Sequence, residues 1–348
     1  MISVIMPVYN SEKYLEAALN SVLMQTGAEL EIIAVDDCSS DSSRDILRRM
    51  SQADGRIKVY ENERNMGVAE VRNRALTYAR GEYLAFCDSD DILPKGAYSA
   101  LLSVIGDRDI AVGAYDNLHD DGRLDGVLPI SKADRGSLFK TMFSVSCLWT
   151  KLIRTSFVRD NSLSFDPSMK IGEDVVFLAN AVMCNPTYAV TDALVYYHCQ
   201  HDTAVSRSLT HVYTLSAFEL HIKCRRRVLA ICSSLAEVRD YIYIDFTPFI
   251  TDFLPLIAGD EERRAAFSLY REYLLEYDFE SRQGLFEALT GVPYSDFLTM
   301  TADEYIECRN STLPRERVLV EFENGMIGMK WIIKYFKAWL KYKFKRER

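Results

Sequence analysis

The sequence has no Cys-x-x-Cys pair, no Gly-x-Gly-x-x-Gly turn and no Gly-x-x-x-x-Gly-Lys-[Ser/Thr] loop. The missing glycine motifs argue against a dinucleotide-binding Rossmann domain and against a P-loop enzyme. The eight cysteines fit free thiols in a reducing cytosol better than a metal or disulfide framework. The longest uncharged run, residues 175–191, contains Asn185-Pro186 and does not suit a membrane span. Met1 leads straight into strand-like sequence, so we expect no signal peptide.

The chain also lacks a general surplus of positive charge. Lys and Arg number 41 against 50 Asp and Glu, and the net charge of −9 argues against a nucleic-acid partner. Residues 330–348 are the exception, because they hold eight basic side chains and one Glu. The rest of the chain is correspondingly more acidic.

Short apolar segments alternate with helical patterns in the first quarter of the chain. Strands are expected at 2–9, 30–35, 57–60 and 83–86. Amphipathic helices are expected between them, and Gly81 is expected to end the third helix. This alternation predicts an α/β fold with a doubly wound, mostly parallel sheet. After residue 115 the pattern changes to an acidic loop or hairpin at 117–126, a last strand at 194–198 and helices from 209 on.

Acidic residues follow two of these strands, at the sheet edge where ligands of parallel sheets bind. Asp88-Ser89-Asp90-Asp91 is a DxD-type cluster whose carboxylates suit a hard cation such as Mn²⁺ or Mg²⁺. A solvated acidic turn is the alternative. Asp36-Asp37 could anchor a base or a ribose, or Asp37 could cap the next helix.

Two further segments carry candidate chemistry. Asn65-Met66-Gly67 opens a helix with Arg72 one turn inside, which suits a phosphate, although Arg72 could form a surface ion pair instead. Glu173-Asp174 opens an apolar helix. One of these carboxylates could deprotonate a hydroxyl group. Alternatively, both could cap and stabilise the helix N-terminus.

Taken together and in this order, the motifs resemble the inverting family 2 glycosyltransferases of the GT-A fold type. The matching stretches are SVIMPVYN (3–10), EIIAVDDCSSD (31–41), ENERNMGVAEVRNRAL (61–76), GEYLAFCDSDD (81–91), FDPSMKIGED (165–174) and YYHCQHDTAVSRS (196–208). The resemblance implies a catalytic domain at 1–208, with a nucleotide-binding half at 1–115 and an acceptor half at 116–208. Beyond the resemblance, the sequence pattern predicts a helical region at 209–322 and a basic amphipathic helix at 323–348. The helical region would shape the acceptor site or mediate self-association as a homo-oligomer.

The resemblance also implies roles for individual residues. On the nucleotide side, the residues expected at the donor are Pro7, Tyr9, Asp37, Asn65 and Arg72. Asp37 would accept a hydrogen bond from a uracil ring, and Arg72 would lie near the diphosphate.

At the reacting end, the resemblance implies that Asp88 reaches the ribose or the hydration shell of the metal. Asp90 would ligate Mn²⁺ or Mg²⁺, and Asp91 would take no direct part. Asp174 would be the general base, with Glu173 as second candidate, and His201 would touch the diphosphate or the metal. The segment 148–152 supplies Trp149 and Lys151 as weak candidates for the acceptor face, although core packing is the favoured role for Trp149.

The implied reaction moves a sugar from a nucleotide-sugar, expected to be a UDP-sugar, to a hydroxyl group of a saccharide or lipid-linked saccharide in surface polysaccharide synthesis. A nucleotidyltransferase of similar α/β fold is the first alternative, but it usually has a Gly-rich basic loop where this chain reads Pro7-Val-Tyr-Asn-Ser11. A catalytically inactive glycan-binding relative is the second. It would lack Asp90 or Asp174, and this chain has both.

The basic segment 330–348 predicts a membrane-surface helix. At 100° per residue its lysines form a stripe beside an apolar face that contains Trp331 and Trp339. Such a helix suits the interface of an anionic bilayer, and we expect a peripheral protein at the cytoplasmic face of the plasma membrane. The alternative is a helix that docks on the protein's own acidic body.

Overall fold

The computed structural model describes residues 1–132, 134–201, 212–235, 238–239, 242, 253–277, 279–290 and 292–311. The chain divides into two compact units. The first comprises Met1–Thr210 and Arg226–Ser233, and the second His211–Arg225 and Ser234–Arg348. The predicted tail helix at 323–348 lies outside the described residues.

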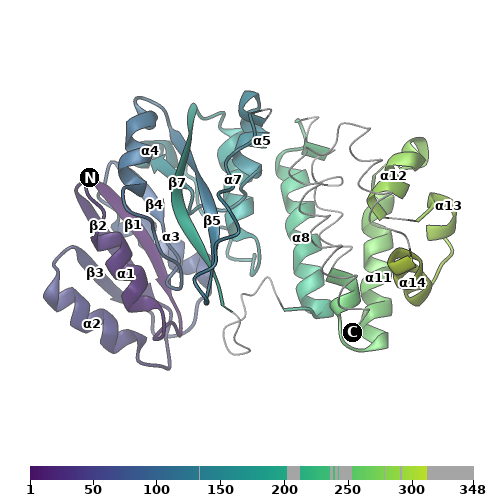
Figure 1. Cartoon of the computed structure of the whole chain (residues 1–348), viewed down its shortest axis with the longest axis horizontal. Coiled ribbons are helices and arrows are strands. Elements are labelled where there is room, and N and C mark those ends of the chain that lie inside the picture. Colours follow the sequence, from purple (N-terminus) through teal and green to yellow (C-terminus); the bar gives the residue numbers. More distant parts are fainter. Residues whose placement is uncertain are drawn as a thin grey trace. The chain divides into compact units, whose positions relative to one another are not determined.

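The first unit contains one seven-stranded sheet (Figure 1). Its strands are β1 (Ile2–Val8), β2 (Leu30–Asp36), β3 (Ile57–Glu61), β4 (Tyr83–Phe86), β5 (Ile110–His119), β6 (Lys151–Arg154) and β7 (Tyr188–Gln200). They lie in the order β3-β2-β1-β4-β6-β5-β7, and β6 alone among them runs antiparallel to its neighbours. The predicted doubly wound, mostly parallel sheet is confirmed.

The direction of β6 decides which segments share an edge. Because β6 opposes β4 and β5, its first residue, Lys151, lies at the edge where the other strands have their last residues. The segments after β4, β5 and β7 therefore meet the segment before β6. This edge is where the candidate residues gather.

Helices separate the first four strands, as the apolar periodicity predicts, whereas the two short helices before and after β6 were not predicted. The helices of this unit are α1 (Leu15–Leu23), α2 (Ser43–Ala53), α3 (Val68–Tyr78), α4 (Ala97–Ile105), α5 (Leu138–Phe143), α6 (Thr155–Asp160) and α7 (Glu173–Met183), with a 3₁₀ turn at Asp134–Gly136. Leu15 and Leu19 of α1 are fully buried in one core with Val4 of β1, as the spacing of three to four residues requires. The core therefore rests on the predicted amphipathic faces.

Gly81 does not end α3 as predicted. Its backbone does not adopt the positive φ of a helix-ending glycine, and α3 ends at Tyr78. A Cβ at this position would come within 2.6 Å of the backbone nitrogen of Ser3, whose hydroxyl accepts the Gly81 N–H at 2.7 Å. The glycine is needed because the chain passes close to β1.

The acidic segment after β5 forms a hairpin. The chain turns at Gly122, with φ +81°, and returns so that Leu124 pairs with Leu118 and Leu128 with Tyr115. The prediction of a loop or hairpin at 117–126 is therefore resolved as a hairpin. It extends β5 over the same edge of the sheet.

The described part of the remaining chain is helical, as predicted. It contains α8 (Leu215–Ile231), α11 (Asp260–Leu275), α12 (Gln283–Thr290), α13 (Tyr294–Phe297) and α14 (Ala302–Ser311), with 3₁₀ turns at Leu254–Leu256 and Glu280–Arg282. Buried aromatic rings of Phe267, Phe297 and Tyr305 pack together between these helices. None of the helices in the described ranges is both long and apolar enough to span a bilayer.

Candidate active site

The acidic turn after β4, residues 88–91, is hydrogen-bonded to one tyrosine of β7. Tyr196 is fully buried; its hydroxyl accepts the Asp88 N–H at 3.1 Å and donates to Asp91 Oδ2 at 2.8 Å. The Cys199 N–H donates to Asp91 Oδ1 at 2.7 Å. Both oxygens of Asp91 are thus engaged within the protein. This buried carboxylate shapes the turn, in keeping with the bystander role expected for it.

Asp88 and Asp90 are the carboxylates of the turn that remain for a ligand. Burial and the nearby charge of Asp88 raise the pKa of Asp90, because both disfavour its ionised form. A hard divalent cation would relieve this repulsion. Within the described residues no group of three or more His, Cys, Asp or Glu side chains could hold a metal. The pair nevertheless fits Mg²⁺ or Mn²⁺, which proteins often bind with one or two carboxylates while substrate phosphates and water complete the shell.

Arg72 connects this turn to the start of α7. Its guanidinium is buried, donates to Asp88 Oδ1 at 3.0 Å and pairs with Glu173 Oε1. Burial opposes the charge of Arg72, but the surrounding carboxylates outweigh it and raise the pKa of the guanidinium. The alternative of a surface ion pair is therefore wrong. Residues 88 and 173, far apart in the sequence, are held by one cation.

The two carboxylates at the start of α7 have different environments. Glu173 is buried against Arg72, whereas no ion pair reaches Asp174 within the described part of the chain. Burial raises the pKa of Asp174 to about 7; the charge of Glu173 adds to the shift, and Arg72 opposes it. Asp174 Oδ1 accepts only the adjacent Val175 N–H, at 2.8 Å. A carboxylate with this pKa can accept a proton near neutral pH.

Asp37 organises the turn that follows β3. Its Oδ1 accepts from Asn62 Nδ2 at 2.7 Å and from the Met66 N–H at 2.8 Å, and its Oδ2 accepts from the Gly67 N–H at 2.8 Å. Asp37 therefore does not cap α2. The turn that it fixes carries Asn65, whose side chain is exposed. Asn62 was missed in the sequence, although its place directly after a strand is the signal that could have found it.

Pro7 and Tyr9 lie at the end of β1, which is next to β2, the strand that Asp37 follows. Pro7 is half-buried within the strand, and Tyr9 follows it with 52% of its surface exposed. An exposed aromatic ring at the carboxyl end of a central strand is available to a ligand. The structure thus places both residues at the predicted edge.

His201 contacts the acidic turn through the main chain. Its Nε2 lies 3.1 Å from the Asp90 carbonyl oxygen and its Nδ1 lies 2.9 Å from Asp120 Oδ1. Its ring stacks on Tyr14 with centroids 3.8 Å apart. His201 therefore links the acidic turn, the hairpin and the start of α1. Asp120 and Tyr14 were not among the predicted site residues.

Lys151 does not face an acceptor. It is 1% exposed, and its Nζ donates to the carbonyl oxygens of Val145 at 2.6 Å and Cys147 at 2.7 Å. Burial lowers the pKa of Lys151 to about 8. The expectation of an acceptor contact is wrong for this residue because its three donor positions are turned inward. It fixes the loop that precedes β6.

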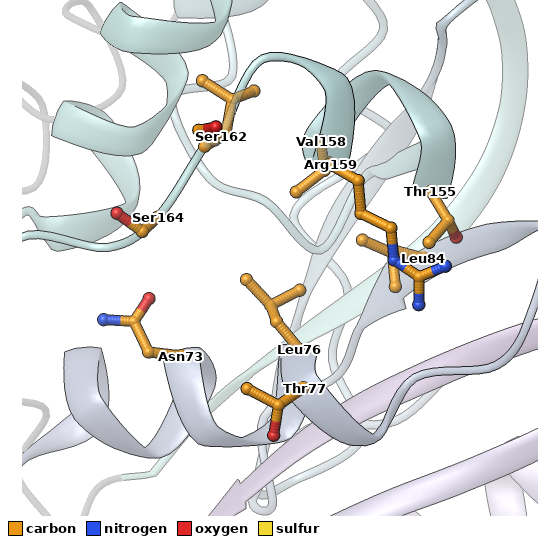
Figure 2. Close-up of a pocket in the computed structure, with 10 residues that line it drawn as sticks. Asn73, Leu76, Thr77, Leu84, Thr155, Val158, Arg159, Ser162 and Ser164 are labelled. Carbon is orange, nitrogen blue, oxygen red and sulfur yellow. The ribbon is translucent and has the colours of Figure 1, made fainter.

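The pocket in Figure 2 is separate from these residues. It measures about 460 Å³ and lies between α3 and the segment around α6. Its lining includes Asn73, Leu84, Thr155 and Arg159. Thr155 directly follows β6, at the end of that strand opposite Lys151. No residue of the acidic turn lines this pocket.

Comparison with known proteins identifies the domain. The sequence profile described as Glycosyl transferase family 2 matches residues 3–154. Residues 3–154 therefore match a family 2 glycosyltransferase domain. The predicted family and its GT-A fold type are confirmed, and the matched range contains the strands β2–β6 and all of β1 except Ile2.

Relatives of this glycosyltransferase domain come from bacterial surface polysaccharide systems. The putative teichuronic acid biosynthesis glycosyltransferase TuaG of Bacillus subtilis is 42% identical over 124 residues, which are 35% of this chain and 49% of TuaG. The Escherichia coli enzyme WfgD, a UDP-Glc:alpha-D-GlcNAc-diphosphoundecaprenol beta-1,3-glucosyltransferase by name, is 35% identical over 157 residues, 44% of this chain and 61% of WfgD. The chain spans about half the length of the curated relatives that it matches.

A solved structure shares the fold over nearly the whole chain. The crystal structure of Staphylococcus aureus TarS residues 1–349 in complex with UDP-GlcNAc matches with a TM-score of 0.59 at 23% identity, covering 99% of this chain and 92% of that one. TarS is named a poly(ribitol-phosphate) beta-N-acetylglucosaminyltransferase. At this identity the match establishes the fold alone.

Proposed function

We propose that the protein is an inverting glycosyltransferase that moves a sugar from a UDP-sugar to a hydroxyl group of a saccharide or lipid-linked saccharide in bacterial surface polysaccharide synthesis. The arrangement around Arg72 carries this proposal. Arg72 pairs with Glu173 and Asp88, while Asp174 has no ion pair in the described structure and a pKa of about 7. One buried cation thus holds a donor-side carboxylate together with the residue next to the proposed base.

The donor is expected at the ends of β1, β2 and β4. Asp37 Oδ2 accepts one protein hydrogen bond, so a lone pair remains for the N–H of a uracil ring. Tyr9 is exposed beside it. The names of the relatives support UDP, because WfgD uses UDP-Glc and TarS was crystallised with UDP-GlcNAc.

Asp90 and Asp88 would hold Mn²⁺ or Mg²⁺ together with the donor diphosphate. Bound there, the cation would supply positive charge to the departing diphosphate. Arg72 donates to Asp88 and keeps that carboxylate in place. The guanidinium also lies over the Phe165 ring, 5.6 Å from its centroid, and this contact helps to fix its position.

The reaction is a single displacement at the anomeric carbon. Asp174 takes the proton from the acceptor hydroxyl group, and that oxygen forms the new bond to the anomeric carbon. The bond between this carbon and the diphosphate oxygen breaks on the opposite side, so that UDP leaves and the configuration inverts. Asp174 supplies general base catalysis, and its pKa near 7 suits that task.

Glu173 is the poorer candidate for the base. Its carboxylate accepts a charge-assisted hydrogen bond from Arg72 and is buried. A carboxylate that is buried and bonded to a guanidinium is not open to the hydroxyl group of an acceptor. Its proposed role is to hold Arg72 so that Asp174 stays free of it.

Nucleotide binding tests the donor assignment directly. We expect UDP to bind more tightly than GDP or dTDP in calorimetric titrations, only when Mn²⁺ is present, and we expect Asp90→Ala to weaken this binding at least about tenfold by removing a metal ligand. Asp45→Ala is a matched control, because Asp45 lies on the exposed surface of α2. Tight metal-independent binding, or unchanged binding by Asp90→Ala, would contradict the metal assignment. No binding of any nucleotide would favour the inactive relative.

We also propose that residues 330–348 bring the enzyme to the cytoplasmic face of the plasma membrane, where a lipid-linked acceptor would be available. The eight basic residues of this segment support attraction to anionic lipid, at about 1 kcal/mol for each basic side chain near the surface. The name of WfgD, whose acceptor carries diphosphoundecaprenol, supports a lipid-linked substrate.

Vesicle sedimentation measures this association. The full chain is expected to bind vesicles that contain phosphatidylglycerol, to bind neutral vesicles weakly, and to be released by salt. Changing Lys330, Lys334, Lys337, Lys341 and Lys345 to Gln should abolish binding. The matched control changes five exposed lysines of the catalytic domain to Gln, namely Lys58, Lys95, Lys132, Lys140 and Lys170. Equal loss in both variants would show that net charge, rather than the tail, is responsible.

A further inference from the structure

An aromatic cluster lies beside the acidic turn, on the side away from the nucleotide strands. Trp149, just before β6, stacks on Tyr196 with ring centroids 4.4 Å apart and planes within 13°. It is also nearly parallel to His198, at 5.7 Å, and meets the ring of Tyr115 edge-on at 4.9 Å. Trp149 also packs against the buried core of the sheet, yet with all these contacts its side chain is only half-buried.

The sheet explains why these rings meet. Tyr115 on β5 is paired with Tyr196 on β7, and alternate residues of a strand point to the same face. Tyr196 and His198 therefore lie side by side beneath the indole. The loop that carries Trp149 is held by Lys151 through the carbonyl oxygens of residues 145 and 147. Trp149 is thus a fixed ring.

The position of Trp149 connects it to the reacting end. The indole stacks on the ring of Tyr196. The hydroxyl group of this tyrosine forms hydrogen bonds with the Asp88 N–H and the Asp91 carboxylate. β6 is next to β4 in the sheet, whereas the proposed nucleotide contacts lie on β1 and β2. A molecule on Trp149 would therefore approach the acidic turn from the acceptor half.

Polar side chains continue the same face past the rings. Asn117 is paired with His198 across β5 and β7, with Asn117 Oδ1 and His198 Nδ1 3.3 Å apart. Gln200 Nε2 lies 2.7 Å from the same nitrogen. All three side chains are half-buried. An aromatic face next to amide groups suits a sugar ring, which has an apolar C–H face and hydroxyl groups at its edge.

The charges near this cluster disfavour an anionic acceptor. The hairpin contains Asp116, Asp120, Asp121 and Asp125, and its one arginine, Arg123, is paired with Asp125. The ammonium group of the nearby Lys151 donates its hydrogen bonds to backbone carbonyl oxygens. With four aspartates and one arginine, the hairpin is negatively charged overall, which disfavours a phosphate group beside it.

We propose that Trp149 is the platform on which the acceptor sugar stacks, so that the acceptor is a neutral pyranose ring rather than an acyclic polyol phosphate. This inference rests on the proposed transferase function, and it chooses between the acceptor classes that the names of WfgD and TarS represent. Trp149 acts as a specificity-determining residue that contacts substrate, with the sugar hydroxyl group directed toward Asp174.

The chain allows a direct optical test, because its three tryptophans are Trp149 and the tail residues Trp331 and Trp339. In the full chain with Trp331→Phe and Trp339→Phe, the tryptophan emission comes from Trp149 alone. With UDP and Mn²⁺ present, methyl glycosides of glucose, galactose, mannose and N-acetylglucosamine are titrated, with ribitol 5-phosphate as the comparison. We expect a saturable emission change with at least one pyranoside and none with ribitol 5-phosphate.

Kinetics on the best pyranoside acceptor separate stacking from folding. We expect Trp149→Leu to raise the acceptor KM about tenfold, while the KM for UDP-sugar hydrolysis without acceptor stays within about twofold. Trp149→Phe keeps a flat ring and should recover most of the loss. A variant that damaged the fold would instead raise both KM values.

The outcomes distinguish this inference from the function on which it rests. A saturable response to ribitol 5-phosphate, or no response to any pyranoside from a protein that still binds UDP with Mn²⁺, overturns the stacking proposal and leaves the transferase standing. Equal changes in donor and acceptor KM for Trp149→Leu also overturn it. Failure to bind UDP or any other nucleotide instead removes the proposed function.

Discussion

Replacing Asp174 with Asn is expected to lower kcat for sugar transfer by about 10²- to 10⁴-fold, the usual contribution of a general base. Asn has nearly the same shape but cannot accept the proton of the acceptor hydroxyl group. Binding of UDP with Mn²⁺ should not change, because no nucleotide contact is assigned to Asp174. Initial rates with a saturating UDP-sugar measure the loss. An Asp174→Asn enzyme with more than about a tenth of the wild-type kcat would contradict the assignment.

The pH dependence follows from the same group. Because the pKa of Asp174 is raised to about 7, its ionised form dominates only above that pH. The wild-type kcat/KM should therefore rise with pH and level off above about 7. Glu173→Gln is the matched control: it removes the neighbouring charge that adds to the shift, so the rise in any remaining activity should move to lower pH.

Stability should change in the opposite sense. Since the folded pKa lies above the unfolded value, protonated Asp174 contributes stability that is fully present below about pH 4 and is lost as the pH rises through about 7. Asp174→Asn avoids the buried charge. At pH 8 its free energy of unfolding, measured with denaturant, should therefore exceed that of the wild type by about 1–2 kcal/mol. At pH 5 the difference in free energy should be smaller.

Replacing Arg72 with Met is expected to lower the free energy of unfolding by about 3–5 kcal/mol, because it leaves Asp88 and Glu173 with no shared cation. Removing one member of a buried ionic group costs far more than removing an exposed pair. Arg48→Met is the matched control. Arg48 pairs with Glu61 on the exposed surface, so its loss should cost less than about 1 kcal/mol. Urea unfolding of both variants gives the comparison.

A second substitution tests whether Arg72 and Glu173 act as a pair. In the double variant Arg72→Met with Glu173→Met, neither charge is buried alone, so part of the lost stability should return. Transfer activity should not return, because Asp88 has lost its partner on the donor side. If the two single losses simply add, the residues do not interact as the structure indicates.

The sequence was sufficient to locate the edge of the sheet that carries the site. Parallel strands end at one edge, so the acidic residues after β2 and β4 had to lie near each other. The same reasoning predicted the helices, because the apolar spacing of α1 and α3 is regular. The order of the later strands was harder to predict from the sequence. The antiparallel direction of β6 depends on its pairing with β4 and β5, which are distant in the chain.

The partners of the site residues could not be predicted. Arg72 and Glu173 are 101 positions apart, and no local pattern pairs a helix interior with a distant helix start. The same holds for Asp120 with His201 and for Tyr196 with the acidic turn. The prediction for Lys151 was wrong because most lysine side chains are exposed. Here the ammonium group is buried and donates hydrogen bonds to two backbone carbonyl oxygens.

The reversed strand β6 also bears on how such enzymes diversify. It joins the donor strands through only three residue pairs with β4, between Tyr83–Ala85 and Leu152–Arg154. The segment ahead of it, which carries Trp149, opens onto the reacting edge, while the segment behind it leads away from that edge. Under the proposed function, a longer or exchanged segment ahead of β6 would change the acceptor while the proposed donor contacts on β1 and β2 keep their residues. Recombination at this seam would yield enzymes that share a sugar donor and decorate different polymers.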